Sequence, residues 1–112
     1  MGDTSWLFHT WLIEKDINMN LLEEYKDLDQ SYLVEKVDGP QVKRMVWAFS
    51  NGYGVSMAMT QRSAIPEAAI IKVTSLTPLD YTVTYNTPIT NDVVPVSCRS
   101  EAEQLFRQVK RL

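Results

Sequence analysis

The residues that could carry out chemistry are few and lie far apart in the sequence. The chain has one histidine, His9, and one cysteine, Cys98. A lone thiol with a lone imidazole is a weak signal for a nucleophile and its base, and the G-x-S-x-G motif of a serine nucleophile is absent. His9 lies in an apolar run, where a hydrogen-bonded structural histidine is commoner than a metal ligand. We therefore predict no metal, no cofactor and no enzyme activity.

The remaining candidates for chemistry favour structural roles. Glu23 and Asp27 are four residues apart, which places both on one outer face of a helix. Glycoside hydrolysis needs two carboxylates that face each other across a cleft, so this pair does not predict it. Three methionines fall within two predicted strands, where packing is expected rather than soft-metal binding: Met45, Met57 and Met59.

The charges divide the chain into two parts. Residues 1–39 contain nine acidic residues and three lysines, which gives a net charge of −6. Residues 40–112 contain five acidic and eight basic residues, which gives +3. One interpretation is that the two parts attract each other or form separate solvated faces. The other is that the acidic part binds a basic partner.

Length and composition indicate one domain and agree with a reducing compartment. The chain has 112 residues and a net charge of −3, which suits a single domain with its own core. A single cysteine allows no disulfide within the chain. The apolar run Trp6–Ile13 is too short to span a bilayer, and Asp3 stands where a secretion signal carries positive charge. We expect a cytoplasmic location and no membrane association.

A β-hairpin over Met45–Thr60 is the strongest structural signal. Asn51-Gly52 between two apolar runs predicts a two-residue type I′ turn. That turn would place Trp47 opposite Ser56 and Phe49 opposite Gly54, so that large side chains cover small ones. Because both faces of the hairpin are apolar, we expect it to be central in a sheet, unless one face is a binding surface.

The acidic region before the hairpin is expected to contain a helix. The apolar spacing of Asp16–Tyr32 predicts a helix with an acidic outer face, and Asp29–Ser31 is an alternative end for it. If the helix ends there, Leu33–Val37 can form a strand before the break at Gly39-Pro40. The apolar run Ser5–Ile13 fits a buried strand or a short helix.

The region after the hairpin predicts two strands, a loop and a helix. Ala68–Thr74 and Tyr81–Tyr85 have β-branched or alternating patterns, and Asn86–Val96 reads as a loop. Ser100–Leu112 has one apolar stripe, with Ser100 and Glu103 as a capping box. The predicted fold is a single α+β domain. It has an antiparallel sheet of about four strands, an N-terminal acidic helix and a C-terminal amphipathic helix. Residues 1–39 form the acidic region, packed on the core of residues 40–112.

Several of these segments together resemble a group of small uncharacterised proteins of bacteriophages and prophages. The matching segments are VWAFSNGYGVS at Val46–Ser56, the strand Ala68–Val73, YNTPITNDV at Tyr85–Val93, and the closing helix. The family shares NGYG-x-S and YDTPIT-[ND]-DV-like motifs, and the match covers about residues 42–112. This chain has Asn86 where the family often has Asp. It also has Pro95–Cys98 where a Gly-aromatic-Leu segment is usual, so the end of the loop is expected to differ.

The resemblance implies a phage accessory protein that works inside a bacterial host. The first hypothesis is a non-catalytic protein that binds a host protein, as an inhibitor of host defence (for example anti-CRISPR-like) or of a host enzyme. Two alternatives stay open: a nucleic-acid-binding module that uses the aromatic side chains of the sheet, and a self-associating structural protein that forms a homodimer. The candidate partner-binding residues are Glu23, Glu24, Asp27, Asp29, Tyr53, Asn91 and Asp92.

Overall fold

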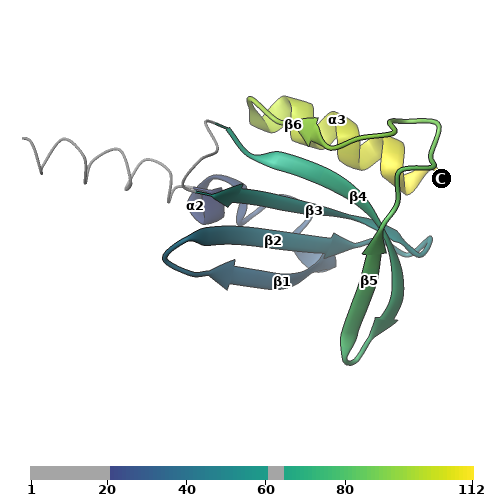
Figure 1. Cartoon of the computed structure of the whole chain (residues 1–112), viewed down its shortest axis with the longest axis horizontal. Helices are drawn as coiled ribbons and strands as arrows, with labels where there is room; N and C mark the ends of the chain where they lie inside the picture. The colour runs from purple at the N-terminus through teal and green to yellow at the C-terminus, as the bar shows by residue number, and fades with distance from the viewer. Residues whose placement is uncertain (1–20, 61–64) are drawn as a thin grey trace, which may run out of the picture.

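The computed structural model describes residues 21–60 and 65–112, which form one antiparallel sheet and two helices (Figure 1). The predictions for His9, for Ser5–Ile13 and for the start of the acidic helix lie outside the described residues. In chain order the elements are α2 (Leu21–Tyr25), the 3₁₀ turn η1 (Gln30–Tyr32), β1 (Leu33–Asp38), β2 (Val42–Ala48), β3 (Tyr53–Thr60), β4 (Glu67–Leu76), β5 (Leu79–Val83), β6 (Val94–Pro95) and α3 (Arg99–Lys110). The predicted α+β class is confirmed.

The sheet has six strands rather than about four. Strands β1 to β5 are neighbours in sequence order, and β6 pairs with the first half of β4. The two strands beyond the four counted are β1, which confirms the strand suggested at Leu33–Val37, and the two-residue β6. The strand predicted at Tyr81–Tyr85 begins earlier, at Leu79, because it forms a tight hairpin with the end of β4 through Thr77-Pro78.

The hairpin is confirmed, but its predicted turn and register are wrong. Trp47 lies opposite Val55 and Ala48 opposite Gly54. The loop has three residues, because the Phe49 N–H donates to the Tyr53 carbonyl at 2.8 Å and the Gly52 N–H donates to the Phe49 carbonyl at 3.2 Å. Gly52 has a φ of 87°, whereas Asn51 is not among the described residues with positive φ. A type I′ turn needs positive φ at both positions, so a type I turn followed by a left-handed glycine forms instead.

The register explains why Gly54 is a glycine. A Cβ atom at position 54 would overlap the Trp47 carbonyl oxygen of the neighbouring strand. Gly54 therefore allows close approach of β2 and β3, and does not make room for the Phe49 ring, as the predicted register required.

One face of the sheet forms the hydrophobic core. It carries Met45, Trp47 and Phe49 from the β2 side and Val55, Met57 and Met59 from β3. Helix α3 covers this face with an apolar stripe of Ala102, Leu105, Phe106 and Val109. Tyr25 and Leu28 complete the core from the N-terminal side. The aromatic rings on the predicted binding face of the hairpin are thus packing residues.

The acidic helix is shorter than predicted at its C-terminal end. It ends at Tyr25 rather than Tyr32, and the Leu28 N–H makes a turn with the Tyr25 carbonyl. Asp29 has φ 45° and ψ 47°, a left-handed conformation that a helix cannot continue through. The earlier end suggested by the Asp29–Ser31 segment is therefore close to the observed one.

The C-terminal helix is confirmed, with a different cap. It begins at Arg99 with Cys98 as its N-cap residue, so the predicted capping box of Ser100 and Glu103 does not form. Instead, the Glu101 carboxylate accepts the Ser97 N–H at 2.7 Å. Glu103 forms an ion pair with Arg99 one turn earlier, with 3.7 Å between Glu103 Oε2 and Arg99 Nε. An acidic residue in the first turn is favourable because it faces the positive end of the helix dipole.

Asn51 connects the hairpin loop to the end of α3. Its Nδ2 donates to the Val109 carbonyl at 2.9 Å and to the Leu112 carbonyl at 3.4 Å. Its Oδ1 accepts the Tyr53 N–H at 3.0 Å. The carbonyls of a last helical turn have no partner within the helix. The Val109 carbonyl belongs to this last turn, whereas Leu112 lies two residues beyond the end of α3. Asn51 thus binds the last turn of α3 and the residue Leu112 after it, and it stabilises its own turn at the same time.

Replacing Gly54 by alanine should destabilise the fold more than the same change at Gly52. The added methyl group at position 54 meets backbone atoms that cannot move aside, at a cost of about 1–3 kcal/mol or more. At Gly52 space is open, and only the left-handed φ costs about 1–2 kcal/mol. Urea unfolding of Gly54→Ala and Gly52→Ala measures the loss in free energy of unfolding for each variant. Equal or greater loss at Gly52 would contradict the observed register.

Asn51→Asp should lower the free energy of unfolding by about 1–2 kcal/mol. The substitution keeps the acceptor for the Tyr53 N–H, but it removes the donor to α3 and places negative charge at the helix C-terminus. The matched control is Asn86→Asp, which changes an exposed loop asparagine. If both variants unfold at the same urea concentration, Asn51 does not cap α3.

Candidate functional site

Among the described residues, the side chains considered for chemistry are the acidic residues and Cys98. No group of three or more histidine, cysteine or acidic side chains in residues 21–60 and 65–112 is placed to bind a metal. Cys98 is exposed, and its Sγ lies 3.1 Å from the Ser100 Oγ. The hydrogen bond with Ser100 and backbone N–H groups at the start of α3 lower the pKa of Cys98. The negative charge of Glu101 opposes this lowering of the Cys98 pKa.

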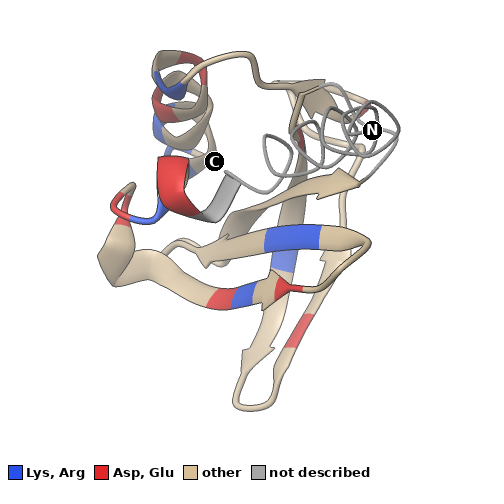
Figure 2. Ribbon diagram, turned by 90° about the vertical axis from the view of Figure 1, so that its left-hand side faces the viewer, with Lys and Arg blue, Asp and Glu red and all other residues tan. Residues whose placement is uncertain are grey.

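Three predicted site residues lie together on the surface of α2 and the turn after it. Glu23, Glu24 and Asp27 are all exposed, and we call them the acidic surface (Figure 2). Glu23 forms an ion pair with Lys26 at 3.1 Å, with side chains 75% and 51% exposed. The carboxylates of Glu24 and Asp27 form no ion pair with any other described residue.

The acidic surface is held beside the start of α3. The Arg99 guanidinium donates to the Glu24 carbonyl at 3.2 Å. Tyr25, the last residue of α2, is only 1% exposed and belongs to the core. The short helix thus has one side fixed in the protein, while its two carboxylates and that of Asp27 in the following turn are exposed to solvent.

Asp29 does not belong to the acidic surface. Its carboxylate pairs with Lys110 near the end of α3 at 2.9 Å, and its side chain is 25% exposed. The Lys110 ammonium also lies 5.2 Å from the ring centres of both Tyr32 and Phe49. Through its pair with Lys110, Asp29 therefore fixes the segment after α2 to α3, which is a structural role.

Tyr53, Asn91 and Asp92 lie away from the acidic surface. The loop that joins β5 to β6 is at the opposite end of the molecule from α2 (Figure 1). Tyr53, at the start of β3, has Lys72 5.7 Å from its ring centre. The Asp92 carboxylate accepts the N–H of Val93, and the Thr90 hydroxyl bonds to the backbone of Asp92. Of the seven predicted residues, the structure therefore brings three together, the members of the acidic surface.

The large aromatic residues of the sheet are not exposed to a ligand. Trp47 is 0% and Phe49 is 6% exposed. The Trp47 indole N–H donates to the Leu28 carbonyl at 2.7 Å, and its ring meets Phe106 edge to face at 4.8 Å. Stacking on nucleic-acid bases requires accessible rings. Tyr53 alone among the predicted stacking residues keeps part of its surface in solvent.

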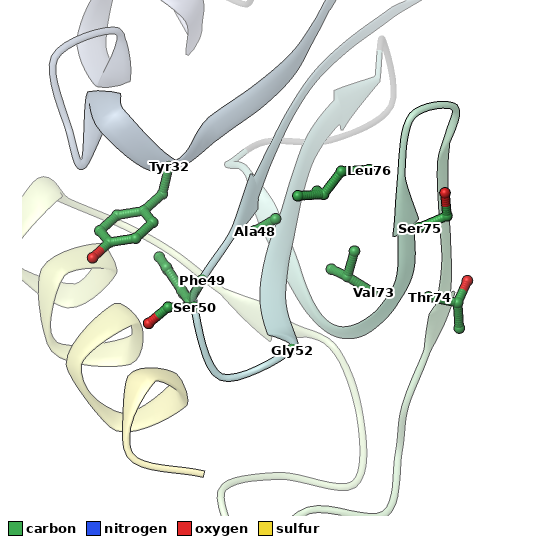
Figure 3. Close-up of a pocket in the computed structure, with 9 residues that line it drawn as sticks. All are labelled: Tyr32, Ala48, Phe49, Ser50, Gly52, Val73, Thr74, Ser75 and Leu76. Carbon is green, nitrogen blue, oxygen red and sulfur yellow. The ribbon is translucent and has the colours of Figure 1, made fainter.

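Two surface grooves were not predicted from the sequence. One has a volume of about 460 Å³ and lies between the hairpin loop and the end of β4, with Ala48, Val73 and Leu76 among its lining (Figure 3). The other, of about 340 Å³, lies between α3 and the loop before β6. The lining of the first groove includes Val73 and Ser75, between which the register of β4 with β5 shifts and from which the β4–β5 hairpin bends away from the rest of the sheet (Figure 1). Sequence patterns do not locate such a bend.

Comparisons with protein families, with curated proteins and with solved structures find no match for this chain. The resemblance to the phage and prophage family therefore stays a prediction from the motifs. Within the described ranges, no helix has the length and apolar character needed to cross a bilayer.

Burial of Tyr25 should make stability fall at alkaline pH. Burial, with a further contribution from the Glu24 charge, raises the pKa of Tyr25 from 10.0 to about 12. The Tyr25 hydroxyl then ionises at a lower pH in the unfolded chain than in the folded chain. The stabilisation is complete below pH 10 and is lost as pH rises to about 12. Tyr25→Phe should lose less stability over this interval, measured by urea unfolding.

The control for this prediction is Tyr85→Phe, because the Tyr85 side chain is 54% exposed. This variant should retain the loss of stability seen in the unmodified protein. If Tyr25→Phe and Tyr85→Phe give the same alkaline profile, Tyr25 is not the group responsible.

Proposed function

We propose that this chain is a phage-encoded, non-catalytic accessory protein that binds a basic surface of a bacterial host protein. It would act in the host cytoplasm as an inhibitor of a defence system or of a host enzyme. The acidic surface of Glu23, Glu24 and Asp27 is the binding site. The bacteriophage assignment rests on the motif resemblance, and the choice of surface rests on the structure.

The observation that carries the proposal is that the fold makes no use of these carboxylates. Glu24 and Asp27 form no ion pair with another described residue, and the exposed pair of Glu23 with Lys26 contributes little to stability. Asp29, by contrast, is used inside the structure through Lys110. Adjacent acids without partners repel one another, and a basic partner would relieve that repulsion and increase its own rate of association.

The burial of the sheet aromatics favours this proposal over nucleic-acid binding. Trp47 and Phe49, which would have stacked on bases, are inside the core. The net charge of −3 also opposes binding to a phosphate backbone.

Removing the charges of the acidic surface should weaken partner binding and leave the fold intact. The test variant carries Glu23→Gln, Glu24→Gln and Asp27→Asn. Tagged full-length protein is incubated with bacterial lysate at low and high salt, with and without nuclease. We expect the unmodified chain to retain a host protein after nuclease treatment, and the variant to bind it about tenfold more weakly. Its free energy of unfolding should change by less than about 0.5 kcal/mol per site.

A matched control removes three charges elsewhere, through Glu67→Gln, Asp80→Asn and Asp92→Asn. It changes the net charge equally and also tests the loop candidate Asp92. The control should retain the partner as the unmodified chain does. Equal loss of binding in both variants would show that net charge, and not this surface, is responsible. Retention that disappears with nuclease would instead favour a nucleic-acid partner and contradict the proposal.

A further inference from the structure

The two outer edges of the main sheet differ in charge. At one edge, β1 carries Glu35, Lys36 and Asp38, and its pairing is irregular between Leu33 and Glu35. Charged side chains and irregularities of this kind protect an edge strand from pairing with another chain. At the other edge, β5 has the sequence LDYTV and carries a single charge, at Asp80. The β5 edge lacks the protection that β1 has.

The β5 edge also has free backbone groups. The Thr84 N–H donates to the Ile70 carbonyl at 2.9 Å, which continues the pairing of β4 with β5. The backbone hydrogen-bonding direction alternates along a strand. The N–H and C=O groups of Thr82 and Thr84 therefore point towards β4, and those of Tyr81 and Val83 point away from it. The sheet order places no strand of the described chain beyond β5. The N–H and C=O groups of Tyr81 and Val83 are therefore open to a partner strand.

Apolar side chains gather around this edge. Three of the five exposed large hydrophobic residues in the described chain are on or next to the β4–β5 hairpin: Leu76 at 60%, Val83 at 41% and Tyr85 at 54% exposed. Between Lys72 and Asp92 the sequence has only one charged residue, Asp80. Figure 2 shows this hairpin almost free of coloured residues. An open edge with this composition is an association surface.

We propose that β5 pairs with β5 of a second copy of this chain, antiparallel and across a two-fold axis at Thr82. This register sets Tyr81 against Val83 of the other copy, and Leu79 against Tyr85, so that apolar side chains meet. Asp80 then lies opposite Thr84. The two Asp80 residues are four residue steps apart, or about 13 Å, which exceeds the screening length of about 8 Å at physiological salt.

Charge is the reason that a second copy fits this edge. Each chain has a net charge of −3, so two copies repel unless they meet through neutral surfaces. The β5 edge is such a surface apart from Asp80, and its own sequence supplies a partner strand with that single charge. A two-fold arrangement also closes after two copies, so it consumes both open edges and forms no fibre.

Substitutions at the two-fold axis test this dimer. In it, Thr82 faces Thr82 of the other copy, so Thr82→Lys or Thr82→Glu places like charges directly opposite each other. Sedimentation equilibrium of the full chain over a range of concentrations should show a dimer for the unmodified protein. Each variant should raise the dissociation constant by about fivefold or more. An equimolar mixture of the two variants should restore dimers, because Lys then faces Glu.

The matched control is Val34→Lys, which adds the same charge to an exposed residue of the β1 edge. It should remain dimeric. Because Thr82 pairs with Lys72 inside the chain, circular dichroism confirms that each variant is folded. The acidic-surface variant should also dimerise, so this test is independent of the proposed function. A monomer at all concentrations, a dimer unaffected by Thr82→Lys, or a mixture that stays monomeric would each overturn the proposal.

Discussion

The burial of the Trp47 indole is the interaction on which the rest of the structure depends. The ring is completely enclosed, and a buried indole N–H is costly unless it finds an acceptor. The Leu28 carbonyl supplies that acceptor from the segment after α2, and Phe106 supplies an aromatic contact from α3. One side chain of β2 therefore connects the N-terminal segment, the sheet and the last helix. The acidic surface keeps its orientation because this segment is fixed to the core.

The sequence was sufficient to locate the central hairpin and the C-terminal helix, because both have strong local patterns. It could not give the hairpin register. Asn-Gly favours a two-residue turn when only local conformation is considered. In the folded chain, the Asn51 amide binds the Val109 carbonyl of α3 and the Leu112 carbonyl just after it, which are 58 and 61 residues away in sequence. The three-residue loop accommodates that contact. Since side chains alternate, a change of one residue in register moves a whole strand's side chains to the other face.

The same distinction between local and distant contacts applies to the candidate site. Glu23, Glu24 and Asp27 were predictable as exposed because they lie on the polar side of an apolar pattern. The role of Asp29 was not predictable, because its partner Lys110 is near the other end of the chain. The open edge of β5 was also beyond sequence patterns, since it depends on the order of strands and not on the composition of any one of them.

The order of the strands has a consequence for synthesis of the protein. Strands β1 to β5 each pair with the next strand in the sequence, so every pairing closes a short loop and can form as the chain leaves the ribosome. The helix that covers the aromatic face begins only at Arg99. Until that helix emerges, the nascent sheet exposes Trp47, Phe49 and Met57 to solvent. The growing chain thus passes through a stage with an uncovered apolar surface, the kind of surface that chaperones protect.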